Sequence, residues 1–193
     1  MKKYLAAAAA FFAVPGVAAA QEAQPAPAAD LGGLRVEARV GWETPTVSED
    51  GEVYKIESDV SWGGEVGFDL ALGGNVVAGP YANYEFSNVN LCDGADCIVE
   101  DGHLGAGVRV GVGVGGGTLI YGKVGYSKIT FTATAAGLSG SDSGDGLQGA
   151  IGANFSIGGK LYALVEANYA DYGDFNGINL QRRHVAAGVG IRF

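Results

Sequence analysis

Two histidines are the side chains in this sequence best suited to acid–base or nucleophilic chemistry. His103 and His184 begin the fourth and the eighth of eight segments in which apolar and polar residues alternate. If these segments close into a ring of strands, the two imidazoles would face each other across one opening. Nucleophilic catalysis also needs a hydroxyl or thiol beside the base, and neither His has a Ser nearby in a recognisable motif. We therefore expect no catalytic residues and no enzyme activity.

Two further motifs resemble ligand sites but lack part of the required pattern. Gly111 to Gly116 has the spacing G-x-G-x-x-G, yet residues 118–127 alternate like a strand, whereas a dinucleotide site requires a helix there. Asp142 to Gly146 lacks the ligand spacing and the terminal Glu of a calcium loop, so a solvated turn is the better interpretation. We expect no cofactor and no metal site.

The only two cysteines, Cys92 and Cys97, enclose four residues of a polar loop. In an exported protein such a pair is expected to form a disulfide. A zinc site is less well supported, because no His or second Cys pair lies nearby. The bridge closes a short loop and should fix a local shape more than it stabilises the fold.

Charged residues recur on the polar side of the alternating segments. Because an unpaired buried ion is very costly, charges enclosed by a narrow ring of strands must pair. We expect Arg39 to contact Glu65 and Glu85 to contact Arg109, since each pair lies on neighbouring segments at similar depth. The predicted network is Arg39, Glu65, Glu85, Arg109, Lys123 and Glu166. It would either close the interior or line a narrow path for ions or small solutes.

The segments that carry these charges alternate with period two and are joined by two kinds of connection. Glycine-rich turns lie at 73–75, 115–117 and 158–159, and longer polar loops lie at about 44–57, 87–102, 132–146 and 171–181. This arrangement predicts an all-β fold, an eight-stranded antiparallel transmembrane β-barrel with short periplasmic turns and long extracellular loops. The alternative is a soluble barrel or sandwich with inverted faces. Aromatic residues near strand ends on the apolar side, such as Trp42 and Tyr169, favour the membrane.

The first 33 residues differ from the rest of the chain. Residues 1–20 contain a Lys pair, an apolar run and a small-residue cleavage site, which is typical of a secretory signal peptide. Residues 21–33 form an Ala/Pro-rich linker, and 34–193 the barrel domain. Without Lys2 and Lys3 the formal net charge falls from -9 to -11, which argues against nucleic-acid binding because that needs a basic surface.

The carboxyl terminus supplies the most specific motif. It ends in an alternating strand with Gly188, Ile191 and the terminal Phe193 at the positions of the insertion signal of bacterial outer-membrane proteins, although Ala186 stands where a polar residue is usual. Together with 121–126 and 164–173, residues 188–193 resemble the small eight-stranded outer-membrane β-barrel family, the OmpA-like and opacity-protein-like surface proteins. The resemblance implies a fold and a location in the outer membrane, and no reaction.

From these features we expect a non-enzymatic barrel in the outer membrane of a Gram-negative bacterium that supports envelope integrity and presents its loops. The alternative function is a small pore or weak channel. Expected partners are outer-membrane lipid and lipopolysaccharide, the barrel-assembly machinery, and host or other surface ligands. We expect no nucleic-acid partner and a monomeric protein.

Overall fold

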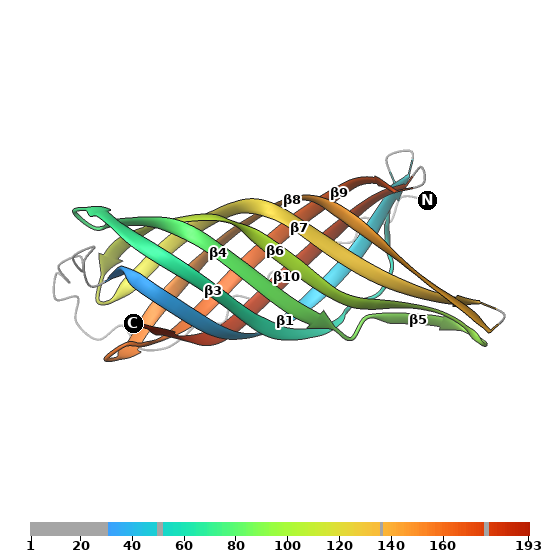
Figure 1. The fold of residues 1–193 in the computed structure, drawn as a ribbon, viewed down its shortest axis with the longest axis horizontal. Helices are drawn as coiled ribbons and strands as arrows, with labels where there is room; N and C mark the ends of the chain where they lie inside the picture. Colours follow the sequence, from blue (N-terminus) through green and yellow to red (C-terminus); the bar gives the residue numbers. More distant parts are fainter. Residues whose placement is uncertain (1–30, 50–51, 136, 176–177) are drawn as a thin grey trace, which may run out of the picture.

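The computed structural model describes residues 31–49, 52–135, 137–175 and 178–193, so the expected signal peptide and most of the expected linker lie outside the described residues. Almost all of the described chain is β-strand (Figure 1). The strands are β1 (Gly33–Glu49), β2 (Glu52–Lys55), β3 (Asp59–Gly73), β4 (Val76–Ser87), β5 (Asn90–Asp93), β6 (Asp96–Gly115), β7 (Thr118–Ala135), β8 (Leu138–Gly158), β9 (Leu161–Phe175) and β10 (Ile178–Arg192). No helix among the described residues is long and apolar enough to cross a membrane.

Eight of the strands close into a ring. The order is β10-β9-β8-β7-β6-β4-β3-β1, and β1 pairs with β10 to complete the circle, with every pairing antiparallel. At the seam Val36 lies opposite Ile191 and Arg39 opposite Gly188. The tilted strands form an elongated barrel (Figure 1). The predicted eight-stranded antiparallel barrel is confirmed, with β2 and β5 as short additions outside the ring.

The two faces of the barrel wall have opposite chemistry. Apolar side chains such as Val40, Trp62 and Val124 point outward and are about half exposed, whereas charged side chains such as Arg35, Arg109 and Glu65 point inward and are buried. The inside-out pattern is the opposite of that of a soluble protein, and it follows the predicted alternation in all eight ring strands. A soluble barrel with inverted faces is therefore wrong.

The two ends of the barrel are built differently (Figure 1). At one end, the short-turn end, the chain reverses at Gly74, Gly116 and Gly159, whose φ angles of 58°, 59° and 56° favour glycine. At the other end, the hairpin end, the expected long loops are wrong in detail, because most of their residues continue the strands. β7 and β8 stay paired from Thr118–Phe155 to Ala135–Leu138. The expected turn at 142–146 is thus part of β8.

Hydroxyl groups help to explain why this hairpin extends so far. Thr132 Oγ1 lies 2.8 Å from Ser141 Oγ, and Thr134 Oγ1 lies 2.9 Å from Ser139 Oγ. Such cross-strand Thr–Ser pairs stabilise an antiparallel ladder without an apolar core. Their polar character predicted a loop, although their period-two spacing is that of a strand.

An apolar cluster lies inside each end of the barrel. Leu31, Val77 and Leu119 are buried together at the short-turn end. Ile129, Ala170, Tyr172 and Leu180 form the cluster at the hairpin end, with Val47, Ile56 and Phe131 packed against it. The charged interior of the barrel, here called the lumen, lies between these two clusters.

Candidate functional site: the charged lumen

The centre of the lumen holds four ionic side chains that interlock, here called the middle layer: Arg39, Glu65, Lys123 and Glu166. Arg39 donates hydrogen bonds to Glu65 at 2.6 Å and to Glu166 at 2.5 Å. Lys123 bonds Glu166 at 2.8 Å and also Glu65. All four are at most 7% exposed. Each carboxylate therefore joins two cations, a closed arrangement that satisfies buried charge.

A second group, the short-turn layer, lies toward the glycine turns and consists of Arg35, Glu37, Asp69, Arg109 and Arg192. Arg35 joins it to the middle layer, with Nη1 2.9 Å from Glu37 and 2.5 Å from Glu65. Contacts are looser elsewhere, since Arg109 lies 3.5 Å from Glu37 and Arg192 lies 3.7 Å from Asp69. Arg109 also stacks 3.9 Å from the centre of the Tyr121 ring. Three guanidinium groups here face two carboxylates.

The third group, the hairpin layer, has the opposite charge balance and consists of Glu43, Glu85, Glu100, His103, Arg182 and His184. Arg182 is its only Arg or Lys, 2.7 Å from Glu43 and 2.9 Å from Glu85. Glu85 also lies 3.8 Å from Arg39, which links this layer to the middle one. The layer therefore holds three carboxylates and one guanidinium, which contacts two of them.

The two histidines meet at Glu85 rather than facing each other across an open mouth. Nδ1 of His184 lies 3.6 Å, and Nδ1 of His103 4.0 Å, from Glu85 Oε2. Ser61 Oγ lies 2.9 Å from His184 Nε2. The Ser61 hydroxyl, the His184 imidazole and the Glu85 carboxylate therefore lie next to one another in a row. Ser61 is only 1% exposed, so its hydroxyl is enclosed by the barrel wall.

The comparison with known families decides the class of protein. A model of the outer membrane protein beta-barrel domain matches residues 4–193. The chain belongs to this family. Its short-turn end is therefore periplasmic and its hairpin end extracellular, and the outward apolar face contacts lipid.

Solved structures show the same fold at low sequence identity. Neisserial surface protein A is 12% identical with a TM-score of 0.59, covering 82% of this chain and 97% of its own. Ail, the attachment invasion locus protein of Yersinia pestis, solved with the heparin analogue sucrose octasulfate, is 13% identical with a TM-score of 0.55, covering 82% and 99%. OprG from Pseudomonas aeruginosa is 14% identical with a TM-score of 0.51, covering 84% and 96%. No curated protein sequence matches the chain.

One expected contact of the network is wrong. Arg39 and Glu65 lie together, as do Lys123 and Glu166, but Glu85 and Arg109 are in different layers. The register between β4 and β6 explains the error, because it sets Glu85 opposite His103 and Gly79 opposite Arg109. The two residues are on neighbouring strands but differ in depth by six residues.

Two buried acids of the hairpin layer were not predicted from the sequence. Glu43 continues the alternation of β1 beyond Trp42, so extending that segment by one residue would have identified it. Glu100 was assigned to a loop, and a β-bulge between Glu100 and Gly102 turns it inward. Its side chain is 1% exposed.

The remaining predicted residues lie outside the lumen. A disulfide joins Cys92 to Cys97 and ties β5 to β6. Of the predicted insertion signal, Gly188 pairs with Arg39 at the seam between β1 and β10, and Phe193 lies exposed at the periplasmic end. Its recognition during insertion stays a prediction.

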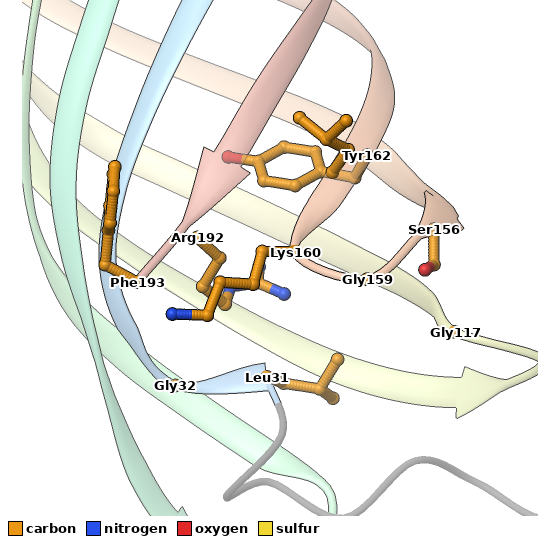
Figure 2. Close-up of a pocket in the computed structure, with 10 residues that line it drawn as sticks. Leu31, Gly32, Gly117, Ser156, Gly159, Lys160, Tyr162, Arg192 and Phe193 are labelled. Carbon is orange, nitrogen blue, oxygen red and sulfur yellow. The ribbon is translucent and has the colours of Figure 1, made fainter.

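A pocket of about 330 Å³ opens at the periplasmic end (Figure 2). It lies between residues 31–32, the β8–β9 turn and the end of β10. Lys160 and Arg192 line it together with the rings of Tyr162 and Phe193. It is separate from the middle layer, and nothing in the sequence analysis singled it out.

Proposed function

We propose that this outer-membrane barrel is non-enzymatic, that it supports envelope integrity, and that it presents its extracellular hairpins as a surface. The filled lumen carries this proposal. Among the described residues, eleven Arg, Asp and Glu side chains, including Arg35, Arg109 and Arg182, are at most 4% exposed, and an apolar cluster lies at each end. Eight strands enclose a space that side chains can fill, which suits an anchor better than a conduit.

The extracellular hairpins provide the presented surface. β5, β6, β7 and β8 pair side by side beyond the lipid-facing residues, and the disulfide fixes the outer edge of that sheet. Its exposed acids include Asp93, Asp96, Asp101 and Asp142. Ail was solved with a polyanionic heparin analogue. Because like charges repel, we expect the surface of this chain to prefer neutral or cationic ligands.

A deletion strain tests both parts of the proposal. We expect loss of the gene to increase sensitivity to detergents and to large antibiotics, and wild-type protein to restore resistance. A variant in which residues 132–141 are replaced by Asn-Gly should also restore it, because the barrel remains, while its surface ligand binding is lost. Normal resistance in the deletion strain would contradict the role in envelope integrity.

The alternative, a small pore or weak channel, is favoured by one observation in the hairpin layer. Both carboxylate oxygens of Glu100 and both ring nitrogens of His103 are buried and have no hydrogen-bond partner among the described protein groups. Buried polar atoms of this kind suit ordered water, which a conducting path requires. Proteoliposomes loaded with small ions and sugars would test it, because a pore releases them at a rate proportional to the protein content.

A further inference from the structure

The periplasmic pocket contains two cationic groups with unused hydrogen-bonding capacity. Nε and Nη2 of Arg192 are buried and have no hydrogen-bond acceptor, and the nearest carboxylate, Asp69, is 3.7 Å away. Lys160 lies 5.9 Å from the centre of the Phe193 ring and forms no ion pair within the described ranges. Figure 2 shows both side chains reaching into the pocket from separate strand ends.

The charge at this end contrasts with that of the whole chain. The formal net charge is -9, yet the adjacent short-turn layer holds three arginines against two acids, and Lys160 adds another cation. The main-chain oxygen of Phe193 lies against Gly33, where a Cβ atom would collide with it. Within the described residues, the chain terminus forms no ion pair with Lys160 or Arg192.

The walls of the pocket are partly apolar and continue onto the lipid-facing surface. Leu31 is 3% exposed and forms an inner wall, whereas Leu161 and Phe193 are 49% and 58% exposed on the outside of the barrel. An aromatic ring and a lysine at a strand end are the usual anchors at the membrane interface. A ligand held here would have its anionic group on the cations and its apolar part along Leu161 and Phe193.

We propose that this pocket binds the phosphate headgroup of an anionic phospholipid of the inner leaflet. The planar guanidinium of Arg192 presents the fork of N–H donors that matches phosphate oxygens, and the Lys160 ammonium adds a mobile point charge. A volume of about 330 Å³ is at the lower end of ligand pockets and holds a headgroup, while the acyl chains lie outside against the barrel. The lipid-facing wall favours a lipid over a free periplasmic anion of the same chemistry.

Native mass spectrometry of the barrel extracted in neutral detergent tests the proposal. Phosphatidylglycerol, phosphatidylethanolamine and inorganic phosphate are titrated in parallel, and folding of each variant is verified by its heat-modifiable migration on gels. We expect phosphatidylglycerol to bind at least fivefold more tightly than phosphatidylethanolamine. Lys160→Gln should reduce this preference about fivefold, consistent with ~1 kcal/mol per basic residue at an anionic lipid surface.

Lys128→Gln is the matched control, because Lys128 is an exposed lysine of β7 toward the extracellular end. It should leave lipid binding unchanged. Arg192→Gln is expected to weaken binding further, although it also alters the contact with Asp69, so Lys160→Gln is the decisive variant. Equal binding of the two lipids, or equal effects of Lys160→Gln and Lys128→Gln, would overturn the proposal. Displacement of phosphatidylglycerol by millimolar phosphate would identify a site for free anions instead.

Discussion

The middle layer and the hairpin layer of the lumen differ in how completely their charges are satisfied. In the middle layer two cations and two carboxylates interlock through four short hydrogen bonds, and each carboxylate accepts from both cations. In the hairpin layer Arg182 contacts the carboxylates of Glu43 and Glu85, while that of Glu100 forms no ion pair among the described residues. Both layers are buried, so burial alone does not set their stability.

This contrast indicates that the layers at different depths along the barrel axis have different roles. A fully paired buried network rigidifies the interior, while a partly paired one is costly and tends to persist where it serves another role. We infer that the middle layer stabilises the closed barrel and that the hairpin layer is the part of the lumen closest to admitting water or protons. Substitutions in the two layers should therefore have effects of opposite sign.

The largest effect is expected for Glu65→Gln. This carboxylate accepts from Arg35, Arg39 and Lys123, and its loss leaves buried cations without their counter-ion. We expect the free energy of unfolding to fall by about 3–5 kcal/mol, measured in lipid vesicles by urea titration with the fluorescence of Trp42 and Trp62. Glu57→Gln, at an exposed position, is the control and should change it little.

Arg109→Ala should have a smaller effect than Glu65→Gln. Its ion pairs are 3.5 and 3.9 Å long, and both carboxylates keep another arginine. The main losses are the stacking on Tyr121 and part of the charge neutralisation, about 2 kcal/mol. The same urea titration measures it. An unchanged unfolding midpoint would contradict the account of a lumen closed by ionic contacts.

Glu100→Gln should stabilise the barrel. The Glu100 side chain is 1% exposed and forms no ion pair within 4.0 Å among the described residues, and a neutral amide removes this buried charge at nearly the same volume. We expect the free energy of unfolding at neutral pH to rise by about 1–2 kcal/mol, measured by the same urea titration. Equal stability of the two proteins would show that Glu100 is adequately solvated.

The smallest effect on the barrel is expected for the double variant Cys92→Ser and Cys97→Ser. The bridge ties β5, which lies outside the eight-stranded ring, to the extracellular end of β6, and such hairpin ends open locally without global unfolding. The unfolding free energy should change by less than about 0.5 kcal/mol, while protease cleavage near Asp93–Asp96 becomes faster. Protection equal to wild type would mean that strand pairing alone holds this hairpin.

The sequence predicted the wall of the barrel better than its contents. Period-two alternation identified all eight ring strands, because a spanning strand must place every second side chain in lipid. It also placed Arg39 and Glu65 together, since they face each other on neighbouring strands. It failed for Glu85 and Arg109, because pairing depth depends on register, and for Glu100, because a bulge shifts the alternation. Neither the strand register nor the position of a bulge can be recognised from the composition of these segments.

Planar-bilayer conductance tests the central claim, that the side chains of the barrel close its own lumen. Purified wild-type protein should give no reproducible channels, because the middle layer joins side chains from β1, β3, β7 and β9 across the interior, and an apolar cluster lies inside each end. Glu65→Gln, which loosens the middle layer, should give brief openings if it remains folded. Reproducible wild-type channels whose conductance changes in Glu85→Gln or Arg109→Ala would contradict the closed barrel and establish the pore.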